Sequence, residues 1–260
     1  MARRRVTDIE VAGEPGPGDG GFLSLVRLRY RNVYADGGRS RPYTYEHIHR
    51  RGFDAVAIGL FHEEAGRPEM AYRPGIRVPA YFRKDLPLAV PDARVNLPIP
   101  EAVAGSLEPS DRGLEGFLGR VTAEVLEEAG FAVRPEDVVP LGGGFFPSHG
   151  QSSEKIHLCA VRVITGQRGE APGDGSVNES DAPPVAFMGL REVLLACAAG
   201  DIEDPKLEIL AWRLSLHLGY LPLEGRYASG PELEALDEFR RAMARGGWNG
   251  RPQTRHLSAR

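Results

Sequence analysis

The chain lacks the features that mark several common protein classes. It has two cysteines in 260 residues, Cys159 and Cys197, both in apolar surroundings without metal-ligand spacing. We therefore expect reduced, buried thiols in a cytoplasmic protein. No apolar run is long enough to span a bilayer, and the basic residues 1–5 lack the apolar segment of a secretory signal. The net charge of −4 gives no electrostatic signature of a nucleic-acid partner.

What is present is the pattern of a globular α/β protein. Periodicity and turn residues predict strands over 23–34, 43–49, 54–61, 70–79, 138–146, 156–165 and 185–190, and helices over 113–129, 190–199, 204–218 and 231–244. Strands interrupted by helices indicate a mixed α/β domain with a sheet between helices. A long loop rich in Gly, Asp and Pro, expected to be mobile, fills 166–183.

We expect three regions along the chain. Residues 1–52 form a small β-rich unit, which is marginal alone and needs a partner surface. Residues 53–222 form the main domain, and residues 223–260 form a C-terminal helix with a basic, polar tail that we expect to be disordered.

Three carboxylates dominate the predicted helix over 113–129. Glu124, Glu127 and Glu128 stand at i, i+3 and i+4, so they share one face and repel one another. A hard divalent cation such as Mg²⁺ takes oxygen ligands and would neutralise this charge. The alternative is an ordinary solvated acidic face. Gly130 suits the C-terminal end of this helix. We expect Ser110 or Asp111 to cap its N-terminal end.

The segment Ala123-Glu124-Val125-Leu126-Glu127-Glu128-Ala129-Gly130-Phe131 resembles the end of the Nudix box, G-x5-E-x7-R-E-U-x-E-E-x-G-U, where U is a bulky aliphatic residue. Ala123 replaces the usual arginine, and Glu115 lies eight residues before it, as the box requires. Pro109 stands where the glycine is expected. Gly105 resembles that glycine, with about four extra residues before the helix. Lengthening a loop in this way costs little conformational entropy.

The resemblance extends to the ADP-ribose and nucleoside-diphosphate-sugar pyrophosphatase branch of this family. It implies an α/β/α sandwich around a mixed sheet, preceded by a small β unit used for homodimer formation. The segment Gly75-Ile76-Arg77 resembles the branch's substrate-binding segment, with Gly75 in place of Gln, and Gly150-Gln151-Ser152-Ser153-Glu154 resembles its loop beside the metals. By this resemblance Arg77 binds substrate, and Glu154 or Glu179 (with Asp181 as a substitute) activates water. The implied metal ligands are the Ala104 carbonyl, Glu124, Glu127 and Glu128, with Glu115 in support.

These expectations combine into one leading hypothesis and two alternatives. The leading hypothesis is hydrolysis of the pyrophosphate bond of a nucleotide-sugar such as ADP-ribose, with Mg²⁺, or Mn²⁺ as a substitute, as cofactor. The first alternative is a Nudix-fold protein that binds a nucleotide-sugar as a regulator without cleaving it. The second is an interaction protein that uses the C-terminal helix and tail. The identity of the base and sugar stays open.

Overall fold

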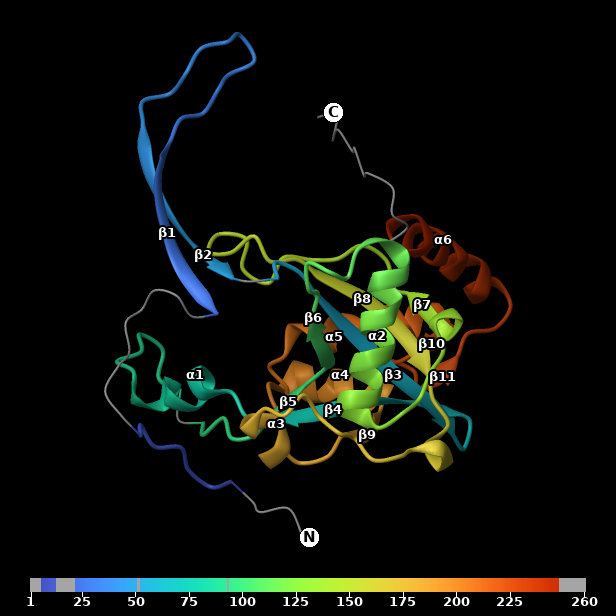
Figure 1. Ribbon diagram of the computed structural model, residues 1–260. Coiled ribbons are helices and arrows are strands. Elements are labelled where there is room, and N and C mark those ends of the chain that lie inside the picture. Colours follow the sequence, from blue (N-terminus) through green and yellow to red (C-terminus); the bar gives the residue numbers. More distant parts are fainter. Residues whose placement is uncertain (1–5, 13–21, 51, 93, 248–260) are drawn as a thin grey trace.

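The computed structural model describes residues 6–12, 22–50, 52–92 and 94–247, except the side chains of residues 179 and 180. Its centre is a mixed sheet, as predicted (Figure 1). Within the described residues the sheet has seven strands: β3 (Ala55–Glu64), β4 (Arg67–Gly75), β5 (Ile99–Glu101), β6 (Val103–Ser106), β7 (Val138–Pro140), β8 (Ile156–Arg162) and β9 (Ala186–Gly189). The main path runs β5-β4-β3-β8-β7. β6 pairs with β3, and β9 with β4. Among the described strand pairs of this sheet, only β3 and β8 run parallel.

Helices cover both faces of this sheet, and β3 is therefore buried on both sides. Val56, Ile58 and Leu60 of β3 pack toward α2 (Gly113–Ala129). The alternating residues Ala57 and Phe61 pack into a second cluster. This cluster includes buried residues of α4 (Leu190–Ala199) and α5 (Pro205–Leu218). Residues that alternate along a strand point to opposite faces, so this apolar run supports a helix–sheet–helix arrangement.

The helix that carries the carboxylates has the predicted bounds but not the predicted N-terminal cap. α2 ends at Gly130, which adopts a left-handed conformation (φ 77°) that glycine takes without steric cost. The expected cap by Ser110 or Asp111 is wrong, since Arg112 holds the cap position without a side-chain hydrogen bond. Asp111 instead accepts hydrogen bonds from the Glu108 amide and from Arg120. Its carboxylate therefore organises the loop before α2.

Several predicted boundaries shift. The strands expected over 54–61 and 70–79 extend toward each other to Glu64 and Arg67, so β3 and β4 form a tight hairpin around Ala65-Gly66, both with positive φ. The strand expected over 70–79 ends at Gly75, and α1 (Val78–Tyr81) follows, since Pro79 suits the first turn of a helix. Of 138–146 only the start is a strand, and the 166–183 loop contains the short helix α3 (Val177–Asp181). The hairpin of β10 (Tyr220–Leu221) and β11 (Arg226–Tyr227) was not predicted from the sequence.

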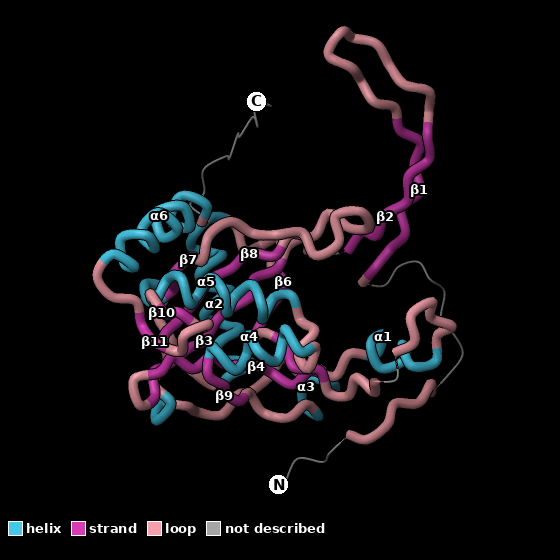
Figure 2. Tube along the Cα trace, turned by 180° about the vertical axis from the view of Figure 1, so that it is seen from behind, coloured by secondary structure: helices cyan, strands magenta, loops and turns pink. Residues whose placement is uncertain are grey.

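The N-terminal β unit is a hairpin of β1 (Leu23–Tyr30) and β2 (Tyr43–Arg50), paired along their whole length. It projects from the body as a long ribbon (Figures 1 and 2). At its base the Ile48 amide donates to the Gln151 carbonyl at 2.7 Å, and Tyr45 donates to the Gly150 carbonyl at 2.7 Å. The hairpin is thus attached to the loop that precedes Glu154.

The C-terminal region contains the expected helix, α6 (Pro231–Gly246), whose Leu236 is buried. The basic, polar tail that we expected to be disordered lies largely outside the described residues, as does much of the segment 1–21. Among the helices that the structure describes, none has the length and apolar character needed to cross a membrane.

Candidate functional site

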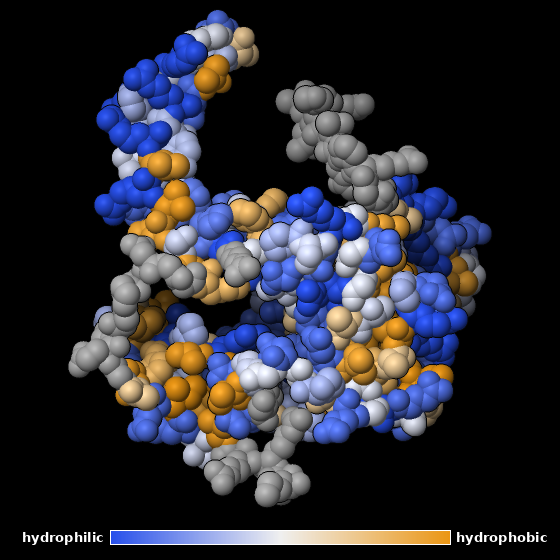
Figure 3. Space-filling model, in the orientation of Figure 1, coloured by the Kyte–Doolittle hydropathy of each residue, from blue (hydrophilic) through white to orange (hydrophobic). Residues whose placement is uncertain are grey.

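A cavity of about 430 Å³ gathers most of the residues that the sequence singled out. It lies where the hairpin base, the β6 segment and α2 meet. In Figure 3 this face is hollowed between the hairpin base and the region around α1. The predicted site residues that line the cavity are Arg77, Ala104, Glu124, Glu127, Glu128 and Glu154. Segments far apart in the sequence therefore converge on one polar space.

Glu124 lies directly against Gly105. A Cβ atom at residue 105 would overlap the Glu124 carboxylate, so a larger residue there would displace that side chain. The Glu124 side chain is 12% exposed, and Arg120 lies one helical turn before it, with Nη1 3.7 Å from Oε1. The hydrogen bond to Asp111 raises the pKa of Arg120, and burial opposes that rise. Arg120 thus supplies positive charge beside Glu124, one turn before the Ala123 that replaces the box arginine.

Glu128 is more enclosed than Glu124. Its side chain is 3% exposed, and it forms an ion pair with Arg73, which is also buried. Its second oxygen accepts a hydrogen bond from the Ala104 amide at 3.1 Å. The alternative of a solvated acidic face is therefore wrong for Glu128. Arg73 was not identified from the sequence, since nothing in an isolated strand shows which carboxylate a distant arginine meets.

Arg77 reaches the cavity while paired with Glu101. Its Nε and Nη2 donate to the two Glu101 oxygens at 2.9 and 2.7 Å, a bidentate arrangement. Glu101 is buried, and a Cβ at Gly75 would overlap its carboxylate. Glycine at 75, where the resemblance implies glutamine, therefore makes room for the carboxylate that orients Arg77. Half of the Arg77 side chain stays exposed.

Glu154 pairs with Arg50 at the end of β2, with Arg50 Nη2 3.1 Å from Glu154 Oε1. Arg50 also donates to the Asp54 carbonyl at 3.1 Å and to Ser106 at 3.3 Å. Its Nε is buried without a hydrogen-bond partner among the described residues. Arg50 lines the cavity and was missed by sequence reasoning, because its strand carries no local signal of a site.

The other predicted site residues are Glu179, Asp181 and Glu115, which come from α3 and from the first turn of α2. Glu179 lies in α3, and its side chain is outside the described part of the structure. Asp181, its substitute, is exposed at the end of α3. Glu115 is exposed in the first turn of α2 and does not line the cavity. The geometry therefore joins Glu154, but not Glu115, to the carboxylate cluster.

A second cavity of about 390 Å³ adjoins the first and shares Glu127 and Glu128 with it. Arg73 and Arg168 line it together with the segment 169–173. This segment is tied to the end of α2, since Gly169 donates to the Gly130 carbonyl at 2.8 Å and Gly173 to the Glu127 carbonyl at 2.9 Å. The first part of the loop predicted as mobile thus has fixed contacts beside the carboxylates.

The chemistry of the donor set fits a hard divalent cation. The candidate ligands are carboxylate oxygens and the Ala104 carbonyl, which Mg²⁺ prefers over nitrogen or sulfur. The box glutamates do not converge on one point, however. Among the described side chains, the one group of three His, Cys, Asp or Glu residues whose ligand atoms lie within 4.8 Å of one another is His62, Glu64 and Glu69. Binding an ion in the cavity would require rotamer changes of the box glutamates.

Both cysteines were predicted to be buried, and Cys197 is less buried than expected. Both are free; Cys159 is buried, as expected, and Cys197 is half-buried. Burial raises the pKa of both thiols, that of Cys197 to about 11 with help from the nearby Glu208 and Asp204 carboxylates. Neither thiol lines the carboxylate cavity.

Comparison with known proteins adds no assignment: no family model matches the chain, and no curated protein matches its sequence. The function is therefore inferred from the residues of the cavity.

Proposed function

We propose that this chain is a Mg²⁺-dependent hydrolase that cleaves the pyrophosphate bond of a nucleoside diphosphate joined to a sugar, such as ADP-ribose. The observation that carries the proposal is the single cavity lined by Glu124, Glu127, Glu128, Glu154 and Arg77. These residues come from separate segments that each resemble the pyrophosphatase branch of the Nudix family. Their convergence in space is independent of the sequence likeness.

The cavity combines groups of both signs, as a bound pyrophosphate would require. Glu124, Glu127, Glu128 and the Ala104 carbonyl would hold Mg²⁺, which when bound neutralises the charge of the phosphate oxygens. Arg77, oriented by Glu101, would bind an anionic group of the substrate through its planar guanidinium. Arg50 adds a second positive group on the hairpin side of the cavity.

Water attacks phosphorus with the help of a general base, and two glutamates are candidates. Glu154 lines the cavity and is held by Arg50, and Glu179 lies on α3. A general base typically contributes about 10²–10⁴-fold. Glu154→Gln and Glu179→Gln, measured side by side, identify the base by which one loses that factor in kcat. If both keep wild-type turnover, neither residue is the base.

A second function, binding without cleavage, is favoured by one specific observation. Arginines already neutralise the carboxylates, Arg73 at Glu128, Arg120 at Glu124 and Arg50 at Glu154. A cavity balanced in this way needs no metal to be stable. Such a protein would bind a nucleotide-sugar and act as a regulator.

A panel of nucleoside diphosphate sugars separates the two functions. The hydrolase releases a nucleoside monophosphate and a sugar phosphate in Mg²⁺, and the release stops when EDTA removes the metal. For a regulator, calorimetry detects binding of one member of the panel, and no product is released. If no member is bound or cleaved, both proposals are wrong.

A further inference from the structure

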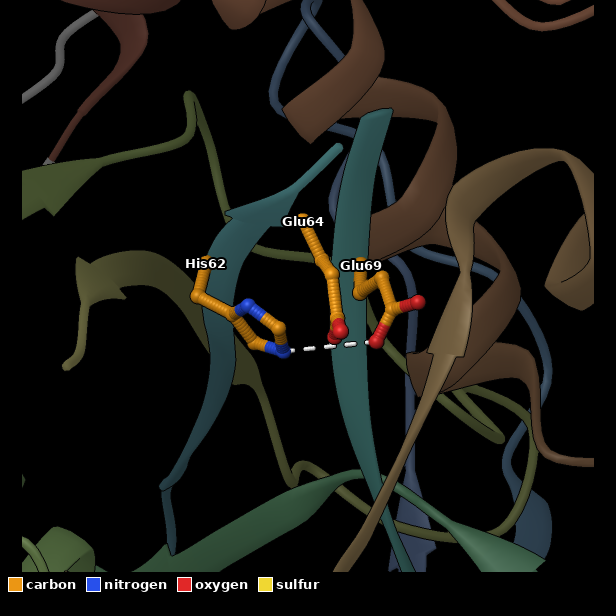
Figure 4. Close-up of side chains that lie close together, drawn as sticks. All are labelled: His62, Glu64 and Glu69. Atoms are coloured by element: carbon orange, nitrogen blue, oxygen red, sulfur yellow. Dashed lines mark ion pairs between the residues drawn. The ribbon is translucent and has the colours of Figure 1, made fainter. Parts of the chain in front are cut away.

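A second group of metal-ligating side chains lies at the far end of β3, on the β3–β4 hairpin. His62 and Glu64 are two residues apart on β3, so both point to one face. Glu69 of β4 is the direct cross-strand partner of His62. One ligand atom from each of the three side chains lies within 4.8 Å of the other two. Figure 4 shows the Glu64 carboxylate directed toward the His62–Glu69 pair.

This group is distinct from the carboxylate cavity. Ala55, at the start of β3, lines that cavity. His62 is seven residues further along the strand, a separation of about 23 Å at roughly 3.3 Å per residue. None of the three residues lines the cavity of the proposed active site.

The charges of the group are unbalanced. His62 Nε2 lies 3.3 Å from Glu69 Oε2, and the His62 side chain is 10% exposed, with the Phe187 ring packed edge-on against it. Glu64 makes no ion pair with any residue that the structure describes, although Arg67 is its partner across the hairpin. Two carboxylates therefore meet one imidazole, a set that is negative when the imidazole is neutral. A divalent cation would remove this repulsion.

We propose that His62, Glu64 and Glu69 bind a divalent transition-metal ion, with Zn²⁺ as the best fit. One imidazole nitrogen with two carboxylate oxygens suits Zn²⁺ better than Mg²⁺, since imidazole is a ligand of zinc, copper, iron and nickel. Three protein ligands leave a fourth position open to water. The ion links both strands of the hairpin beside the turn Ala65-Gly66, so it clamps them together.

The ligands need only a small movement to meet the ion. Zn–N and Zn–O distances are about 2.0–2.2 Å, so ligand atoms around one ion lie at most about 4.3 Å apart. The three observed ligand atoms lie within 4.8 Å of one another, and the His62–Glu69 pair, at 3.3 Å, is already inside that limit. Glu64 is exposed near the end of β3, so a rotation of its side chain closes the group without disturbing the core.

Calorimetric titration of the full chain with Zn²⁺, in millimolar Mg²⁺ to occupy hard-cation sites, tests the proposal. Glu64→Gln and Glu69→Gln are expected to weaken one Zn²⁺ equivalent at least about 10–100-fold. Glu63→Gln is the matched control, because Glu63 stands between two ligands on β3 but contacts Arg162 and Tyr227 instead. It is expected to bind as the wild type does.

His62→Gln alters a buried residue and can reduce folding by itself, so the exposed Glu64→Gln variant carries the decision. Zn²⁺ is also expected to raise the melting temperature of the wild type and of Glu63→Gln, and not that of Glu64→Gln. If Glu64→Gln and Glu69→Gln bind Zn²⁺ with wild-type affinity, the proposed site is wrong. The same conclusion holds if the wild type binds no Zn²⁺ in excess Mg²⁺.

Discussion

The Glu124 carboxylate occupies the space that a side chain at residue 105 would need. This contact joins β6 to α2, and Glu124 and Ala104 line one cavity. The glycine thus accommodates a close approach of the Glu124 side chain and is not needed for its backbone angles, since its φ is not positive.

Gly105→Ala is expected to displace Glu124 and to lower Mg²⁺-dependent hydrolysis at least about tenfold, since misplaced catalytic groups lose rate steeply. The measurement is kcat/KM for a cleaved nucleotide-sugar. Gly119→Ala is the matched control on α2, where an added Cβ meets nothing within 4 Å. It is expected to keep full activity and to gain about 0.5–1 kcal/mol in stability. Equal activity of the two variants would contradict the role given to Gly105.

The buried pair of Arg73 and Glu128 makes a prediction about stability. Glu128→Gln removes the carboxylate that faces the buried Arg73, which is expected to cost about 3–5 kcal/mol. A domain with ordinary stability of about 5–15 kcal/mol still folds under that cost. Urea unfolding measures the loss, and Glu128→Gln is also expected to remove most of the activity and to weaken Mg²⁺ binding.

The double variant Arg73→Met/Glu128→Leu removes both charges, so it is expected to be more stable than Glu128→Gln alone. Exposed carboxylates such as Glu136 provide the comparison, since Glu136→Gln is expected to change stability by less than about 0.5 kcal/mol. If Glu128→Gln is as stable as the wild type and binds Mg²⁺ equally well, the pair does not have the importance assigned to it.

From the exposed apolar residues of the β1–β2 hairpin we expect a homodimer. Leu25 and Leu28 are 61% and 53% exposed on opposite faces of a two-stranded sheet that is marginal alone, so other surfaces are needed to cover them. Light scattering is expected to show a dimer at micromolar concentration, and Leu25→Asp/Leu28→Asp is expected to give a folded monomer. Leu223→Asp, at an exposed leucine outside the hairpin, is the control and stays dimeric. A monomeric, well-folded wild type rules this prediction out.

Thiol chemistry tests the surroundings of Cys197. Burial raises its pKa to about 11, so its thiolate is scarce at pH 8 and appears only as the pH approaches that value. We expect alkylation at pH 8 to be about 100-fold slower than for a free thiol, and faster at higher pH. Cys159 is buried and is expected to react more slowly still. Both thiols should react at the free rate in urea, and a free rate in the folded protein would contradict the described burial.

The sequence predicted the elements that have strong local signals. α2 and β3 follow from a carboxylate-rich helical pattern ended by Gly130 and from an unbroken apolar run, and both lie close to where they were expected. The segment 76–79 was misassigned as strand, because its apolar residues fit either structure until Pro79 is recognised as a helix-start residue.

The partners of the site residues could not be predicted in the same way. Arg73, Glu101 and Arg50 meet their partners through sheet pairing and chain crossing, which no local pattern encodes. The His62–Glu69 pair depends on the register of a two-residue turn, and a shift by one residue would have moved Glu69 to the other face. Sequence likeness supplied the identity of the candidate residues, and the fold supplied their charge partners.

The most direct test of the central claim is product analysis with ADP-ribose, comparing the wild type with Glu124→Gln in Mg²⁺. The predicted result is that the wild type forms AMP and ribose 5-phosphate in equal amounts, that EDTA stops the reaction, and that Glu124→Gln lowers kcat at least about 100-fold while circular dichroism shows an unchanged fold. If the wild type cleaves neither ADP-ribose nor another nucleotide-sugar, or if Glu124→Gln cleaves it at the wild-type rate, the cavity is not the site of a metal-dependent pyrophosphatase.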